Sequence, residues 1–140
     1  MQRTLVQNVA GLVGIVFLLV GIAGFIPGLT TNLYDGLEFA GNDGTAELLG
    51  IFQVSVLHNI VHGLFGLAGL ALAATPSGAR TYLIGGGAIY LALWLLGLIG
   101  GGDWIPANTA DNWLHFALGT GMIALGVLTG RERVRTTTTA

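Results

Sequence analysis

The stretch "VAGLVGIVFLLVGIAGFI", residues 9–26, decides the class of fold, because it contains no charged or polar side chain and ends at Pro27. A helix rises 1.5 Å per residue, and about 20 mostly apolar residues cross a bilayer. Three further apolar segments cover residues 48–74, 82–101 and 113–130. None alternates with a period of two, which favours helices over strands. The sequence therefore predicts an all-α fold, a four-helix transmembrane bundle.

The composition supports a lipid environment. Of the 140 residues, 53% are hydrophobic and only 9% are charged, and the mean hydropathy is +0.77. A soluble domain carries roughly 25% charged residues. We expect one domain over residues 1–135 and a disordered tail over residues 136–140. The absence of cysteine excludes disulfides and thiolate metal ligands, and no basic stripe with aromatic residues indicates a nucleic-acid partner.

The basic residues predict the orientation of the four spans. Every arginine falls on one side of the predicted membrane: Arg3, Arg80, Arg131, Arg133 and Arg135. The acids of the loops fall on the other side: Asp35, Glu38, Asp43, Glu47, Asp103 and Asp111. Basic loops stay in the cytoplasm, so both termini are expected there. The first apolar run is longer than the usual signal-peptide core of about 7–15 residues, which favours a retained helix.

Two histidines stand in the otherwise apolar second segment, in "LHNIVHG", residues 57–63. At 3.6 residues per turn, His58, Asn59 and His62 share one face. Asn112 and His115 share a face of the fourth segment in the same way. Counting from the inner ends puts His62 and His115 at a similar depth. Polar side chains avoid lipid, so we expect these five residues to form a buried cluster between the second and fourth spans, in the outer half of the bilayer.

Three interpretations of the cluster remain open. The residues could bind a haem or a metal ion, with His58, His62 and His115 as candidate ligands. They could pass protons or small solutes, although no ionisable residue continues inward past His62. They could also be structural and hydrogen-bond across helices, at about 0.6 kcal/mol each. The sequence has no nucleophile–base pair, phosphate loop or paired buried carboxylates, which argues against enzyme activity of the soluble type.

The two polar segments also resemble each other in sequence. Aligning His62 with His115 aligns Gly66 with Gly119, and a weaker match sets Gly11, Gly21 and Gly24 against Gly87, Gly97 and Gly100. This pattern suggests two related helical hairpins.

The motifs "FQVSVLHNIVH" and "NTADNWLH" resemble a bacterial membrane family, the one catalogued as domain of unknown function 4383. The resemblance covers roughly residues 8–129 and implies a four-helix protein of a bacterial inner membrane, but no activity. We therefore expect a non-enzymatic membrane component that holds a buried His/Asn cluster. The alternative is a redox or transport protein that uses haem or a metal. The expected partners are the lipid bilayer and either a second copy or another membrane protein.

Overall fold

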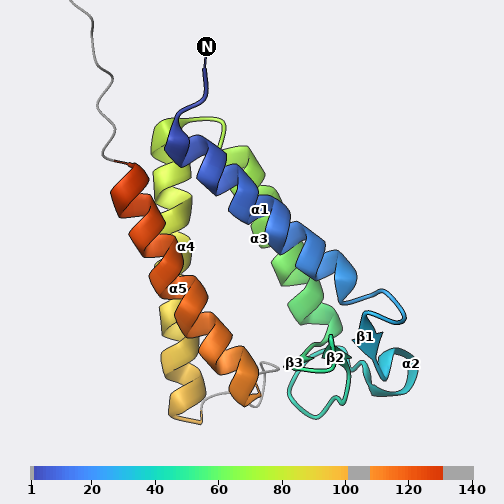
Figure 1. The fold of residues 1–140 in the computed structure, drawn as a ribbon. Coiled ribbons are helices and arrows are strands. Elements are labelled where there is room, and N and C mark those ends of the chain that lie inside the picture. The colour runs from blue at the N-terminus through green and yellow to red at the C-terminus, as the bar shows by residue number, and fades with distance from the viewer. Residues whose placement is uncertain (1, 101–107, 131–140) are drawn as a thin grey trace, which may run out of the picture.

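The computed structural model describes residues 2–100 and 108–130, and long helices dominate this part of the chain (Figure 1). In chain order the elements are α1 (Leu5–Ala23), β1 (Thr30–Thr31), α2 (Leu33–Gly36), β2 (Glu47–Leu48), β3 (Phe52–Gln53), α3 (Val56–Leu72), α4 (Pro76–Leu98) and α5 (Thr109–Thr129). The structure is 69% helical, which confirms the mainly helical part of the prediction. The predicted tail, residues 136–140, lies outside the described residues.

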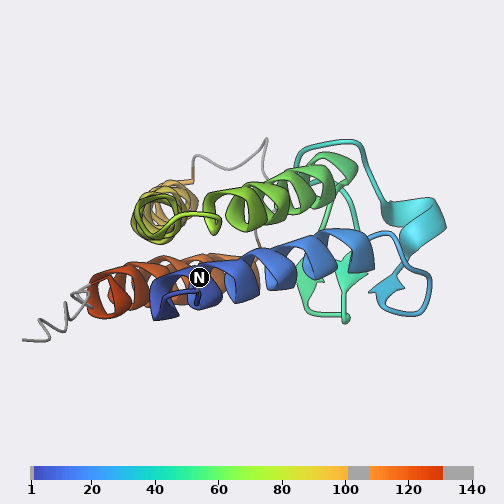
Figure 2. The same ribbon diagram turned by 90° about the horizontal axis from the view of Figure 1, so that it is seen from above.

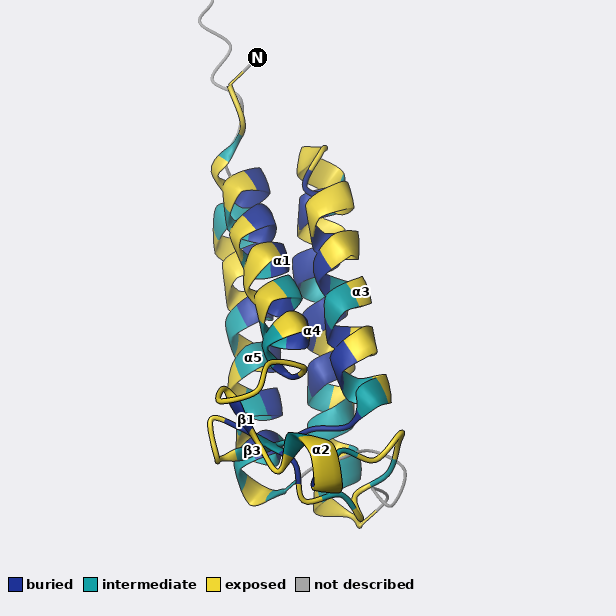
Figure 3. Ribbon diagram, turned by 90° about the vertical axis from the view of Figure 1, so that its right-hand side faces the viewer, coloured by how far each residue is buried: buried dark blue, intermediate teal, exposed yellow. Residues whose placement is uncertain are grey.

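Helices α1, α4 and α5 are each long and apolar enough to cross a membrane, and α3 is a shorter apolar helix of 17 residues. Their outward faces carry large exposed hydrophobic side chains, such as Leu12 at 63% and Leu64 at 60% exposure. The buried faces of the same helices turn toward one another (Figure 3). Apolar side chains exposed over a whole helical surface are what a membrane protein presents to lipid.

The helices associate as two antiparallel pairs, α1 with α3 and α4 with α5 (Figures 1 and 2). The two pairs also contact each other where α1 approaches α4. Helices α3 and α5 lie at opposite corners (Figure 2). The end with the α3–α4 turn is called the turn end below, and the opposite end, where the small sheet lies, is called the cap end.

Glycines allow both pairs to pack backbone against backbone. A Cβ atom at Gly14 of α1 would lie 2.9 Å from the carbonyl oxygen of Gly66 on α3, and one at Gly66 would lie 2.6 Å from that of Gly14. The same reciprocal contact joins α4 to α5: a Cβ at Gly87 would meet the carbonyl oxygen of Gly119 at 2.7 Å, and one at Gly119 that of Gly87 at 2.9 Å. Real Cβ atoms do not approach so closely. Small residues of this kind bring helices together in membranes.

The two pairs repeat each other in structure. The residues that begin α3 and α5, Ser55 and Asn108, both cap the helix by accepting a backbone N–H three residues on. From these caps the spacing is the same to Asn59 and Asn112, to His62 and His115, and to Gly66 and Gly119. The match of α3 with α5 thus has the register expected from sequence.

The expected register of α1 with α4 was wrong. The contacts make Gly14 of α1 equivalent to Gly87 of α4, because Gly14 meets Gly66 and Gly87 meets Gly119, which are equivalent residues of α3 and α5. The expected match made Gly11 the equivalent of Gly87. In the observed register Phe17 of α1 corresponds to Tyr90 of α4, and both are buried. The long connection of the first pair, residues 24–55, forms an addition that the second pair lacks.

This addition, called the cap, covers the cap end of α1 and α3. Strands β1, β2 and β3 form an antiparallel sheet in that order, with Thr30 opposite Leu48 and Leu48 opposite Phe52. The buried side chains of Ala46, Leu48 and Val54 form a small core against partly buried residues of α1. Thr30 fixes the cap to α1, because its hydroxyl donates to the carbonyl oxygen of Ala23 at 3.1 Å.

The expected helix bounds need correction at several ends. The second span was expected from residue 48, but α3 begins at Val56, because Leu49 and Gly50 have positive φ angles of 56° and 66° and turn β2 into β3. Helix α4 begins at Pro76, well before residue 82, because proline suits the first turn and Thr75 caps it. Helix α1 covers Leu5–Ala23 where 9–26 was expected, and α5 begins at Thr109 where 113 was expected.

The glycine contacts predict a matched pair of variants on α3. Gly66→Ala places a Cβ 2.5 Å from the backbone nitrogen of Leu18, whereas a Cβ at Gly63 meets nothing within 4 Å. We expect Gly66→Ala to lose about 1–3 kcal/mol of stability by overpacking, and Gly63→Ala to gain up to about 1 kcal/mol from helix propensity. Unfolding by SDS in mixed micelles, followed by circular dichroism, measures both. Equal stability of the two variants would contradict the packing described here.

Candidate functional site

The start of α5 is fastened to the cap by a buried carboxylate. Asp111 is 3% exposed, and its Oδ2 accepts the backbone N–H of Gln53 in β3 at 2.9 Å and that of Asn108 at 3.2 Å. Asn108 in turn donates from Nδ2 to the carbonyl oxygen of Ile51 at 2.7 Å. The two motifs that carry the family resemblance therefore meet here, since Gln53 belongs to the first and Asn108 and Asp111 to the second.

The start of α3 carries the two neighbouring histidines. Ser55 accepts the backbone N–H of His58 at 3.2 Å and so fixes the first turn. The Nε2 atoms of His58 and His62 lie 2.8 Å apart, a hydrogen bond in which one ring donates and the other accepts. His58 is half-buried, whereas His62 is only 8% exposed. The pair therefore leads from the cap end toward the interior.

Four repeat-related side chains form what is called the polar layer: Asn59 and His62 of α3, and Asn112 and His115 of α5. Each asparagine rests on a glycine of the paired helix, Asn59 on Gly24 and Asn112 on Gly97. Asn59 and His115 are only 2% and 4% exposed.

Polar atoms of this layer are buried without a hydrogen-bond partner among residues 2–100 and 108–130. They are Asn59 Nδ2, His62 Nδ1, Asn112 Oδ1 and His115 Nδ1. A buried polar group without a partner costs about 1–3 kcal/mol. Native proteins hold few such groups. Among the described residues two more lie outside this layer, Tyr82 Oη and Trp94 Nε1.

Aromatic rings close the polar layer toward the turn end. Phe17 of α1 packs on Tyr90 of α4 with ring centroids 5.2 Å apart. Each ring also holds the histidine of its own pair: Phe17 lies 5.4 Å from His62, and Tyr90 lies 5.4 Å from His115. Tyr90 contacts His62 as well, at 6.4 Å. Both histidines therefore lie at the level of Tyr90.

The structure joins the expected cluster differently from the sequence-based hypothesis. His58 and His62 meet directly, but α3 does not pack on α5, so the expected interface between the second and fourth spans is not formed. Phe17 and Tyr90 come from the other two helices and contact the histidines instead. The reason is that the glycine faces pair each polar helix with its own apolar neighbour.

A further expectation concerned metal ligands. Among residues 2–100 and 108–130 no group of three or more His, Asp or Glu side chains is arranged to hold a metal ion, and a metal-binding role of His58, His62 and His115 stays a prediction. The carboxylate of Asp111 bonds to the backbone amides of Gln53 and Asn108.

Sequence reasoning missed Gln7, a buried side chain near the turn end of α1. Its Nε2 donates to the carbonyl oxygens of Ala73 at 3.1 Å and Ala74 at 2.9 Å, which lie just past the end of α3. Its Oε1 accepts from the backbone N–H of Thr4 at 3.1 Å. The available signal was an amide side chain beside a long apolar run, a position where a polar group needs a partner.

Comparison with protein families finds one match. The model of a family described as a domain of unknown function (DUF4383) matches residues 7–128 of the chain. No curated protein and no solved structure matches the chain significantly. The family match spans all four long helices and the cap, so the resemblance expected from the two motifs is confirmed.

The role of Asp111 predicts that its loss releases the cap. Asp111→Ala removes the acceptor for the amide of Gln53, so we expect hydrogen exchange at that amide to accelerate by about tenfold or more. Asp35→Ala, at an exposed acid of α2, is the matched control and should leave exchange unchanged. Circular dichroism checks that the long helices persist. Unchanged exchange in Asp111→Ala would show that this carboxylate does not hold the cap.

Proposed function

Because the chain belongs to the DUF4383 family and its exposed helical surfaces are apolar, we propose that it is a multi-pass membrane protein that binds a small polar ligand in its polar layer. The observation that carries the proposal is the buried set of unpaired polar atoms on Asn59, His62, Asn112 and His115. The protein is then a non-enzymatic membrane component whose binding site lies in the outer half of the bilayer.

Charge supports the membrane orientation. Arg3 and Arg80 belong to the turn end, while the exposed acids Asp35, Glu38 and Asp43 belong to the cap. Basic residues remain on the cytoplasmic side of inner membranes. The turn end therefore faces the cytoplasm, the cap faces outward, and each of the four helices is one span of the bundle.

The chemistry of the layer limits the ligand. Asn59 Nδ2 donates, Asn112 Oδ1 accepts, and each histidine Nδ1 donates or accepts according to its tautomer, so the ligand has donors and acceptors of its own. The carboxylate nearest the cap end of α5, Asp111, is engaged with two backbone amides, which disfavours a role as counter-ion. The stacked rings of Phe17 and Tyr90 close the layer inward, which favours a small ligand that enters and leaves on the cap side.

A metal ion at His58 and His62 is the second candidate, favoured by the 2.8 Å separation of their Nε2 atoms. Two imidazoles one helical turn apart can bind one ion. A haem between His62 and His115 fits less well. The ring of Tyr90 lies against both imidazoles, so a macrocycle bound to both histidines would displace it.

The proposed topology predicts where reporter domains appear. A fusion at Asp43, in the cap, should report the outer side of the membrane, and a fusion after Thr137 should report the cytoplasm. Paired alkaline phosphatase and fluorescent-protein fusions measure both sites in cells. A phosphatase signal from the Thr137 fusion would overturn the arrangement of four spans with both termini inside.

The proposed binding site predicts that a ligand is purified with the protein. The native protein is extracted in mild detergent and purified, and it is then denatured to release what it has bound. The released small molecules are identified by mass spectrometry, and the metals by elemental analysis. We expect a small polar compound from the wild type but not from the double variant His62→Phe/His115→Phe. Tyr82→Phe is the control, because Tyr82 Oη is also buried and unpaired, but residue 82 lies about 12 Å of helix rise from Tyr90 toward the turn end.

The outcomes separate the two candidates. Release of the same compound from the double variant, or of no compound and no metal from the wild type, would overturn ligand binding at the polar layer. A metal ion that is present in the wild type and lost in His58→Phe would favour the second candidate. Circular dichroism of each variant confirms that the fold persists.

A further inference from the structure

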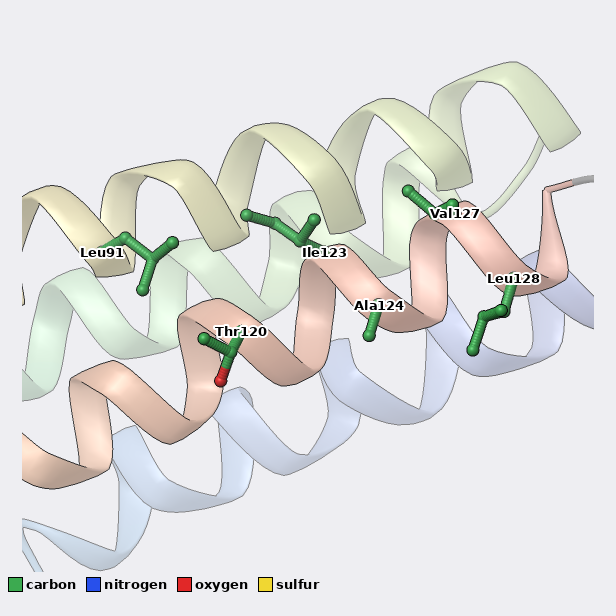
Figure 4. Close-up of a pocket in the computed structure, with 6 residues that line it drawn as sticks. All are labelled: Leu91, Thr120, Ile123, Ala124, Val127 and Leu128. Atoms are coloured by element: carbon green, nitrogen blue, oxygen red, sulfur yellow. The ribbon is translucent and has the colours of Figure 1, made fainter.

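An apolar groove runs along the outside of the second helix pair, on the inner half of α5 (Figure 4). It has a volume of about 440 Å³ and is called the α4–α5 groove; its lining residues are Leu91, Thr120, Ile123, Ala124, Val127 and Leu128. The one hydroxyl in this lining is already used, because Thr120 Oγ1 donates to the carbonyl oxygen of Phe116 at 2.8 Å. The groove therefore offers no hydrogen bond and suits a hydrocarbon chain.

A basic side chain stands at the turn end of the groove. Arg80, Ile84, Gly87 and Leu91 follow one another on the face of α4 that meets α5. The contacts settle this placement, because a Cβ at Gly130 would meet Arg80 Cδ at 2.8 Å and one at Gly119 would meet Leu91 Cγ at 2.7 Å. Arg80 is exposed, so its guanidinium is available to a ligand from outside the protein.

The dimensions match one leaflet of a bilayer. From Thr120 to Leu128 the helix rises about 12 Å, and from Leu91 to Arg80 about 16 Å. One leaflet contributes about 15 Å of a hydrocarbon core of about 30 Å. In the proposed topology the groove opens into the cytoplasmic leaflet, with Arg80 at the depth of the phosphate groups.

We propose that the α4–α5 groove binds an acyl chain of an anionic phospholipid whose phosphate is held by Arg80. Arginine recognises phosphate through paired N–H donors, and a basic residue at the membrane surface favours an anionic head group. The apolar groove fits the acyl chain, and Arg80 determines which lipid head group is preferred. This inference rests on the membrane location proposed above and is independent of the polar layer.

The test uses the purified full chain and native mass spectrometry. The protein is titrated with phosphatidylglycerol or with phosphatidylcholine of the same acyl chains. We expect the wild type to bind phosphatidylglycerol about fivefold more tightly, the effect of one basic residue. Arg80→Gln should abolish the preference, while Arg3→Gln, at the other described arginine of the turn end, should keep it. Ala124→Phe fills the groove and should weaken both lipids, while Ala68→Phe, exposed on α3, should not.

Three results would overturn the proposal. They are equal affinity of the wild type for the two lipids, an unchanged preference in Arg80→Gln, or a dimer that Ala124→Phe disrupts, which would make a second copy the occupant. Extraction with alkaline carbonate separates this failure from failure of the membrane location. A chain that stays in the carbonate-washed membrane but shows no lipid preference retains its proposed location and loses only this inference.

Discussion

The close approach of glycine backbones is the constraint on which the rest of the structure depends. Gly14 with Gly66, and Gly87 with Gly119, bring the helices of each pair so near that no side chain fits between them. Lipid tails are as apolar as the helices, so the hydrophobic effect does not drive helices together within a membrane. Their association there depends on close packing of this kind. These contacts choose the partners: each helix that carries histidine is paired with one that carries an aromatic ring at the same level. The polar layer and the aromatic rings that contact its histidines follow from this pairing.

The two helix pairs are alike in their glycine contacts and differ at the cap end. At the third residue of the helix, α3 has His58 and α5 has Asp111, and these equivalent positions perform different tasks. His58 bonds to His62 and lies one helical turn nearer the cap end. Asp111 binds the cap, which only the first pair carries in its connection, and so fastens the second pair to the first. Through Asp111 this asymmetry couples the cap to the helices that hold the polar layer.

Much of this structure was predictable from the sequence. Long apolar runs without alternation predict helices, and the spacing of His58, Asn59 and His62 predicts a shared face. The cap was not predictable, because the run "LLGIF" before Gln53 is as apolar as a helix and only the positive φ angles of Leu49 and Gly50 turn it into a hairpin. The diagonal placement of α3 and α5 also escaped prediction, since every helix carries small residues and sequence alone does not say which faces pair.

The unpaired polar atoms of the polar layer recur between the two helix pairs, unlike the unpaired Tyr82 Oη and Trp94 Nε1. Replacing an unsatisfied buried polar group by an apolar one of similar shape is neutral or stabilising, so nothing in folding alone retains it. In this protein Asn59 and His62 recur as Asn112 and His115, each with an unpaired atom. At the equivalent positions nearer the cap, His58 and Asp111, the residues differ and find bonds within the protein. The same polar residue types thus recur at the positions where the described residues supply no hydrogen-bond partner. This recurrence is expected if the partner comes from outside the chain.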